Sequence, residues 1–254
     1  MKYKKLLVLI TCLLFVTVAV FCFASAFKVT DIELKVTAVE GSSENIETKC
    51  SAVLVEYENK NLIFVNKDRI GSKLSALSGY IEVVSVEKEF PNKISVTVKE
   101  RVESFVIKNG DDYYAMNLDF VVLNKKQSVA NNLGGNNLLI KLDYSDYSSD
   151  IKVGKSLQVY DENLLKIMKD SAPMLNAVKG SIDSVSYSLK SEGREAKVIT
   201  LKMKEGCVFK ILKADEETEL KLNATYDFYL SLENKGVNEY VTVLGDDGKI
   251  SIRQ

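Results

Sequence analysis

The sequence has no histidine among its 254 residues, and this absence excludes several kinds of catalytic site. Serine–histidine–aspartate triads, cysteine–histidine pairs and histidine-ligated zinc all need an imidazole ring. Only 2 prolines accompany 13 glycines, so long linkers rich in these residues are excluded. The formal net charge is −1, which leaves no basic excess for binding nucleic acid. Carboxylate-only and serine–lysine mechanisms are the enzymatic alternatives that remain.

An uncharged run of residues, LLVLITCLLFVTVAVFCFASAF, occupies positions 6–27 and follows lysines at positions 2, 4 and 5. At about 1.5 Å per residue it spans roughly 33 Å as a helix, enough to cross a bilayer core of about 30 Å. We therefore predict a single transmembrane helix over 6–27. The positive-inside rule places the tail 1–5 in the cytoplasm and the rest of the chain outside the membrane.

A cleaved signal peptide is the alternative, because Ala24, Ser25 and Ala26 match a small-residue cleavage site. The apolar part of a signal peptide usually has about 7 to 15 residues, and this run is longer, which favours an uncleaved anchor. Both interpretations export residues 28–254. In that part of the chain we expect Cys50 and Cys207 to be lone buried thiols, although a disulfide between them stays open.

Residues 28–101 predict a small α+β domain with the order strand, helix, helix, strand, strand. The first strand covers 27–36. Ser42 and Ser43 are candidate N-caps for the first helix, and the second helix follows Asp68. The last two strands, 81–90 and 93–101, alternate in polarity on either side of a Pro-Asn turn.

Residues 102–254 predict a mostly antiparallel β domain with flanking helices. One helix begins near Asp161, and Pro173 is expected to break or kink it. A last helix, about 215–233, is expected to bury four apolar side chains. These are Leu222, Tyr226, Tyr229 and Leu230. The chain ends in a hairpin around Asp246-Asp247-Gly248, because Asp-Gly between two alternating runs is a strong hairpin signal.

The segment VEKEFPNKISVTVKER, residues 86–101, resembles the segment that closes the POTRA domain in the DivIB/FtsQ family of bacterial cell-division proteins. The matching positions are Phe90, Pro91, Asn92, Glu100 and Arg101. The short basic tail, the single span and the domain order resemble that family too. The resemblance implies a POTRA domain at 28–101 and a β domain at 102–254. One departure is Met116-Asn117-Leu118-Asp119, where the family usually has Asp-x-x-Gly.

The resemblance implies a non-catalytic membrane scaffold at the division septum. Such a protein binds small bitopic coiled-coil proteins, FtsL-like and FtsB/DivIC-like, and helps regulate the septal peptidoglycan synthase. By position, the partner-binding residues are those of the last two strands. They are Tyr240, Val241, Thr242, Val243, Leu244, Lys249, Ile250, Ser251, Ile252 and Arg253. A terminal strand with a free edge can accept a strand from another protein, which supports this assignment.

No residue pattern points to catalysis. The spacing S-x-x-K occurs three times, starting at Ser25, Ser85 and Ser149, which is about the number expected by chance and never at a predicted helix start. No cofactor or metal motif is present, so we expect no cofactor and no metal site. Two other functions stay open: a general envelope POTRA protein of secretion or sporulation, and a hydrolase secreted after cleavage at Ala26.

Overall fold

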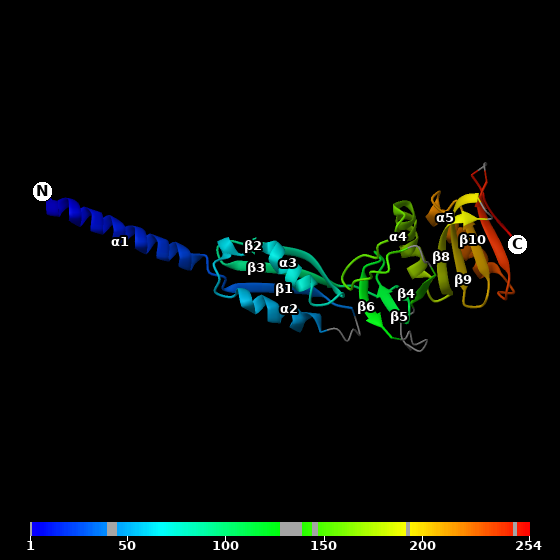
Figure 1. Cartoon of the computed structure of the whole chain (residues 1–254), viewed down its shortest axis with the longest axis horizontal. Coiled ribbons are helices and arrows are strands. Elements are labelled where there is room, and N and C mark those ends of the chain that lie inside the picture. Colours follow the sequence, from blue (N-terminus) through cyan, green and yellow to red (C-terminus); the bar gives the residue numbers. More distant parts are fainter. Residues whose placement is uncertain (1, 40–44, 128–138, 144–146, 192–193, 246–247) are drawn as a thin grey trace. The chain divides into compact units, whose positions relative to one another are not determined.

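The structure is a computed structural model in which two compact units follow one another along the chain, Met1–Arg101 and Val102–Gln254 (Figure 1). It describes residues 2–39, 45–127, 139–143, 147–191, 194–245 and 248–254. Among these, the side chains of residues 2, 5–9, 19–20, 22–24, 190–191 and 194–196 are not described. The overall class is mixed α+β, as predicted.

The chain begins with helix α1, Lys2–Ala26, which is 25 residues long. Across the described part of the chain, no helix combines the length and the apolar character needed to cross a membrane. The transmembrane helix predicted over 6–27 stays a prediction.

The rest of the first unit has the predicted order of strands and helices. Its elements are β1 (Asp31–Thr37), α2 (Ile46–Leu54), the short 3₁₀ helices η1 (Val55–Tyr57) and η2 (Leu62–Phe64), α3 (Lys67–Ser75), β2 (Ile81–Glu89) and β3 (Lys93–Glu100). The candidate caps Ser42 and Ser43 lie outside the described residues. The N-cap of α2 is Asn45, whose side-chain oxygen accepts a hydrogen bond from the Thr48 amide at 3.4 Å.

The three strands of this unit form one sheet in the order β1-β3-β2. Strand β3 lies in the middle, parallel to β1 and antiparallel to β2. Helices α2 and α3 contact β1 and β2, and the alternating residues Ile94, Val96 and Val98 of β3 are fully buried in the core beneath them. The loop from β2 to β3 is Phe90–Asn92, with a cis peptide bond between Phe90 and Pro91.

The Glu-Arg pair at the end of β3 holds neighbouring backbone in place. Glu100 is buried, and its Oε2 accepts a hydrogen bond from the Val39 amide at 2.7 Å. Arg101 donates from Nη1 to the carbonyl oxygens of Gly79 and Ile81 at 3.1 and 2.8 Å. Two positions of the family-like motif therefore have structural contacts that explain them.

The second unit is built on one nine-stranded sheet in the order β12-β11-β10-β9-β8-β7-β4-β5-β6. Its elements are β4 (Phe105–Asn109), β5 (Asp112–Met116), β6 (Val122–Lys126), β7 (Ile140–Asp143), α4 (Glu162–Ala177), β8 (Ile182–Ser191), β9 (Arg194–Met203), β10 (Val208–Leu212), α5 (Thr218–Ser231), β11 (Glu239–Leu244) and β12 (Ile250–Arg253). Strand β7 is parallel to β4 and β8, and β10 is parallel to β11. The other neighbours are antiparallel, so antiparallel pairing predominates as predicted.

The helices of this unit differ from expectation at two points. Helix α4 continues through Pro173 to Ala177, so the expected break at the proline is wrong, while the alternative of a kink stays a prediction. Leu230 of α5 is exposed, since the buried face of that helix is formed by Lys221, Leu222, Thr225 and Tyr229. The predicted start of α4 is confirmed, because Asp161 is its N-cap and accepts from the Leu164 amide at 3.0 Å.

The exported cysteines are free thiols. Cys50 lies in the core of the first unit and Cys207 in the core of the second, and both side chains are fully buried. Burial raises the pKa of both thiols. The expectation of lone buried thiols is therefore confirmed, and the open alternative of a disulfide between them is excluded in this structure.

Candidate partner-binding edge

The C-terminal hairpin forms one end of the nine-stranded sheet. Residues Val241 to Leu244 of β11 pair with Arg253 to Ile250 of β12 in antiparallel register. The connection closes with a hydrogen bond from the Gly245 amide to the Lys249 carbonyl at 2.8 Å, and Gly248 adopts a positive φ of 74°. Residues 246 and 247 of the predicted turn lie outside the residues that the structure describes.

One face of β11 packs into the core through an aromatic cluster. Tyr240 stacks on Phe209 of β10 with ring centroids 5.2 Å apart, and it meets Phe228 of α5 edge-on, also at 5.2 Å. Such aromatic pairs add stability beyond the area that they bury. Tyr240 is buried, so its side chain fixes the position of β11 and is not part of the outer surface.

A buried hydroxyl pair joins the same face of β11 to α5. The Oγ1 atoms of Thr225 and Thr242 lie 2.9 Å apart, and both residues are buried. Thr225 also donates to the carbonyl oxygen of Lys221 at 2.7 Å. Because each hydroxyl has only one proton, Thr242 is the donor in the hydrogen bond between the two threonines.

The first turn of α5 is attached to the end of β10 by a buried lysine. Lys221 is fully buried, and its Nζ donates to the carbonyl oxygens of Leu212 and Lys213 at 3.1 and 2.8 Å. Burial lowers the pKa of this ammonium group. The two hydrogen bonds satisfy carbonyls at the point where β10 ends, which fixes α5 against the strands that carry the hairpin.

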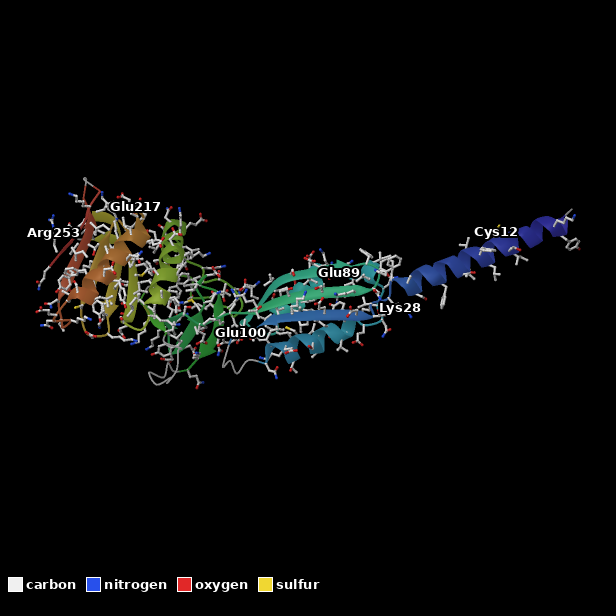
Figure 2. All side chains as sticks on the ribbon, turned by 180° about the vertical axis from the view of Figure 1, so that it is seen from behind. Cys12, Lys28, Glu89, Glu100, Glu217 and Arg253 are labelled. Carbon is white, nitrogen blue, oxygen red and sulfur yellow. The ribbon has the colours of Figure 1, made fainter. Side chains whose placement is uncertain are left out.

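The opposite face of the hairpin is more exposed. Val241 and Val243 of β11 point to this face, as do the residues paired with them, Arg253 and Ser251. Val241, Val243 and Ser251 are half-buried. Arg253, labelled in Figure 2, is exposed. Beside them, Lys210 and Glu239 form an exposed ion pair at 2.9 Å. This face therefore offers a short apolar strip bordered by charge.

The outer edge of β12 presents backbone groups. Within the described residues, no strand lies beyond β12 in the sheet. Hydrogen-bonded and non-hydrogen-bonded pairs alternate along antiparallel strands, and Gly245 with Lys249 is a hydrogen-bonded pair. The pairs Leu244–Ile250 and Thr242–Ile252 are therefore non-hydrogen-bonded pairs. The N–H and C=O groups of Ile250 and Ile252 point away from β11, toward the free edge.

The ten predicted partner-binding residues therefore do not form one surface. All ten lie on the terminal hairpin, but Tyr240 and Thr242 are buried, Lys249 and Arg253 are exposed, and the others are half-buried. Ile252 also packs against the core cluster. The supporting residues Lys221 and Thr225 were missed from the sequence, because a pattern of apolar spacing treats a lysine and a threonine on a helix as surface.

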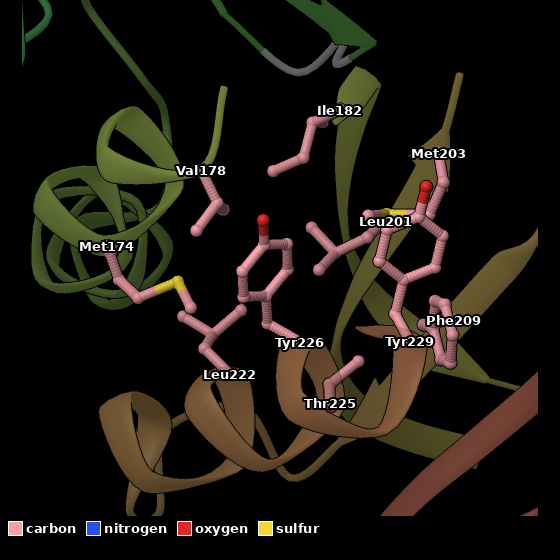
Figure 3. A pocket seen from close by; sticks show the side chains of 10 residues that line it. All are labelled: Met174, Val178, Ile182, Leu201, Met203, Phe209, Leu222, Thr225, Tyr226 and Tyr229. Atoms are coloured by element: carbon pink, nitrogen blue, oxygen red, sulfur yellow. The ribbon is translucent and has the colours of Figure 1, made fainter. Parts of the chain in front are cut away.

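The structure also places one small cavity and the S-x-x-K serines. A small cavity of about 10 Å³ lies between α4, α5 and the sheet, with a nearly all-apolar wall (Figure 3). That volume has room for about one water molecule. Of the S-x-x-K serines, Ser25 is in α1, Ser85 is in strand β2 and Ser149 is in a loop. Among the described residues, no group of three or more acidic or cysteine side chains could hold a metal ion.

Comparison with known proteins identifies the first unit and relates most of the chain to cell-division proteins. Residues 35–101 match the profile of the POTRA domain, FtsQ-type. Cell division protein DivIB of Clostridium botulinum (strain Hall) is 27% identical over 174 residues, which cover 68% of this chain and 63% of that protein. DivIB of Clostridium tetani is 23% identical over 225 residues, 87% of this chain and 78% of that protein. The first unit is a POTRA domain of the FtsQ type, and the chain is similar to the cell-division proteins DivIB.

Proposed function

We propose that this protein is a non-catalytic scaffold of the division machinery, and that it binds its main partner by adding a partner strand to β12. The observation that carries the proposal is the free edge of β12, where Ile250 and Ile252 direct their backbone groups outward. Strand addition derives its affinity from such main-chain hydrogen bonds. The similarity to proteins named for cell division supports the cellular role over a general envelope function or a secreted hydrolase.

The partners in this proposal are small bitopic division proteins. An FtsB/DivIC-like protein supplies the strand that pairs with β12, and an FtsL-like protein joins the same complex. Val243 and Ser251, on the more exposed face of the hairpin, give side-chain contacts to the partner. Through this complex the protein helps to regulate the septal peptidoglycan synthase without acting on peptidoglycan itself.

The proposal also includes the membrane anchor. The uncharged run 6–27 lies in α1 up to Ala26, and the three lysines before it favour a cytoplasmic N-terminus. The protein is then a single-pass protein of the cell membrane, with residues 28–254 outside and a division-site location. The domain division of this proposal is a tail at 1–5, a span at 6–27, a POTRA domain at 28–101 and a β domain at 102–254.

A proline at Ile250 tests strand addition directly. The N–H of Ile250 points outward, so Ile250→Pro removes a donor for the partner strand and keeps the β11–β12 ladder. Ile250→Val is the matched control, since it keeps the N–H and changes the side chain by one methylene. We expect the proline variant to bind the FtsB/DivIC-like partner about tenfold more weakly or worse, and the valine variant to bind nearly as well as the parent.

Binding is measured with both full-length proteins by titration, and circular dichroism checks that each variant is folded. Equal binding by the parent and a folded Ile250→Pro variant would show that β12 is not the docking edge. Loss of binding in the valine variant as well would assign the interaction to the side chain and contradict strand addition.

An N-terminal fluorescent fusion in dividing cells tests the cellular part of the proposal. A band at midcell during constriction is the expected result. A uniform envelope signal would favour the general POTRA function. A fluorescent label left on a short fragment, with the remaining chain in the medium, would show cleavage after Ala26 and no anchor.

A further inference from the structure

One end of the POTRA sheet carries exposed apolar side chains that the partner edge does not use. Phe64 is 84% exposed at the end of η2, and Phe90 is 62% exposed in the β2–β3 loop. Ile63 is exposed as well, and Phe27 beside Phe90 is half-buried. We call Phe27, Ile63, Phe64 and Phe90 the aromatic rim. Exposed aromatic clusters of this kind mark interaction surfaces.

Contacts within the unit bring the rim together from three separate segments. The rings of Phe27 and Phe90 meet edge-on with centroids 5.9 Å apart. The Leu62 amide donates to the carbonyl oxygen of Phe27 at 2.7 Å, and Lys88 donates from Nζ to the carbonyl oxygen of Ile63 at 3.1 Å. The rim is therefore a built surface, held by backbone and side-chain hydrogen bonds.

The rim lies at one defined end of the domain. Figure 2 shows Lys28 and Glu89, the neighbours of Phe27 and Phe90, at the same end of the sheet, with Glu100 at the opposite end. Charges of both signs lie next to the rim segments: Lys28, Lys60, Glu58 and Glu89 are exposed, and the half-buried Lys88 donates to the Ile63 carbonyl oxygen. A partner selected by charge would need an excess of one sign, so apolar rings are the feature that recognises the partner here.

The position of the rim in the chain identifies its partner. Phe27 directly follows Ala26, the last residue of α1. If α1 crosses the bilayer, as in the proposed function on which this inference rests, Phe27 emerges at the lipid–water interface. Aromatic residues are enriched at that depth, where ring faces meet acyl chains and nearby polar groups meet water. Phe90 meets the Phe27 ring directly, and Leu62, two residues before Phe64, is hydrogen-bonded to the Phe27 carbonyl oxygen, so both segments start beside the same point.

We propose that the aromatic rim inserts into the lipid–water interface beside the point where α1 leaves the membrane. The rim and α1 are two attachments of the POTRA domain to the same bilayer. This double attachment fixes the end of the sheet against the membrane and restricts swivelling about residue 27. Because the surrounding charges are of mixed sign, the insertion does not require anionic lipid.

The absence of tryptophan from the sequence makes a clean test possible, because one substitution creates a single reporter. Phe64→Trp reports on the rim, and Phe21→Trp reports on α1. Tyr160→Trp is the matched control, an equally conservative change at a 69% exposed position in the other unit. Each full-length variant is reconstituted into phosphatidylcholine vesicles, with or without bromine on the acyl chains near the headgroup.

We expect Phe64→Trp to emit at shorter wavelength in vesicles and to lose intensity when the lipid is brominated, while Tyr160→Trp changes in neither respect. Quenching of Phe21→Trp without quenching of Phe64→Trp would overturn the rim proposal and leave the anchor intact. Absence of quenching at Phe21→Trp would instead overturn the anchor in the proposed function. Equal quenching at Phe64→Trp and Tyr160→Trp would show general adsorption, and it too would overturn a rim-specific contact.

Discussion

The buried threonine pair between α5 and β11 leads to a quantitative prediction about the support of the docking edge. Thr225 donates to the Lys221 carbonyl, and Thr242 donates to Thr225. Removing the Thr225 hydroxyl leaves the hydroxyl of Thr242 buried without its partner. The cost of an orphaned buried polar group is about 1–3 kcal/mol, so we expect Thr225→Val to lower the free energy of unfolding by about 2 kcal/mol.

The reciprocal change is expected to cost less. In Thr242→Val the remaining hydroxyl of Thr225 keeps its hydrogen bond to Lys221, so only one net hydrogen bond is lost, worth about 1 kcal/mol. The double variant removes both hydroxyls and leaves no orphan. We expect it to be about as stable as Thr242→Val alone, which gives a favourable coupling of about 2 kcal/mol between the two substitutions.

Urea unfolding of residues 28–254 measures this cycle, with near-ultraviolet circular dichroism following the aromatic cluster around Tyr240 in the same unit. With a slope of about 2 kcal/mol per M, Thr225→Val lowers the midpoint by about 1 M, and the double variant lowers it by about half as much. Additive effects, with the double variant the least stable of the four proteins, would refute the assigned direction of the hydrogen bonds. Equal loss in the two single variants would refute it as well.

Other residues give three further predictions. Burial raises the pKa of Tyr187 above its unfolded value of about 10. The stability that the protonated side chain contributes is therefore complete below about pH 10 and is lost as the pH rises above that value. Tyr187→Phe should flatten the decline in the urea midpoint measured above pH 10. Glu100→Ala should destabilise the first unit by about 1–3 kcal/mol in urea unfolding followed by a probe of that unit, such as the exposure of the Cys50 thiol, because the Val39 amide loses its partner, whereas unchanged stability would contradict that bond. Cys50 and Cys207 should react slowly with a thiol reagent in the folded protein and rapidly in urea, and rapid reaction before unfolding would contradict their burial.

Local sequence patterns predicted the elements of the first unit well. The alternation Ile94, Val96, Val98 places three side chains on one face of β3, and all three are fully buried. The spacing of Ile70 and Leu74 likewise gives the buried face of α3. In a strand, side chains on one face recur every two residues, and in a helix about every 3.6 residues. A short stretch of sequence contains the whole of such a pattern, so these elements could be predicted from it.

The same rules failed where a distant contact determines the local structure. The parallel pairings of β7 with β4 and β8 join segments far apart in the chain, and no short pattern encodes them. The apolar residues Phe120 and Val121 precede strand β6, which begins only at Val122, because Phe120 adopts a positive φ of 57° while its ring stacks on Phe105. Lys221 can be buried because its ammonium group donates hydrogen bonds to two backbone carbonyl oxygens. Those carbonyl groups lie next to the ammonium group only in the folded structure.

The candidate edge illustrates the same division between local and distant information. Alternation at Val241, Val243, Ile250 and Ile252 indicated two strands, and both are present. Their register decides what each residue does, because Val243 lies opposite Ser251 on the more exposed face, while Ile252 lies opposite buried Thr242. A shift of one residue would exchange those faces, so a list of edge residues from sequence alone combines docking and core positions.

The composition of β12 also explains how a free edge avoids pairing with its own kind. The strand has only four residues; Lys249 precedes it and Arg253 is its last residue, and both are exposed. If two copies paired antiparallel through β12 with Ser251 at the centre, Lys249 of each copy would lie opposite Arg253 of the other. Like charges placed directly opposite one another destabilise a strand pair, so the edge resists self-association. A partner strand with an acidic residue at each end would replace both repulsions with attraction, and this difference would make the edge selective for such a strand.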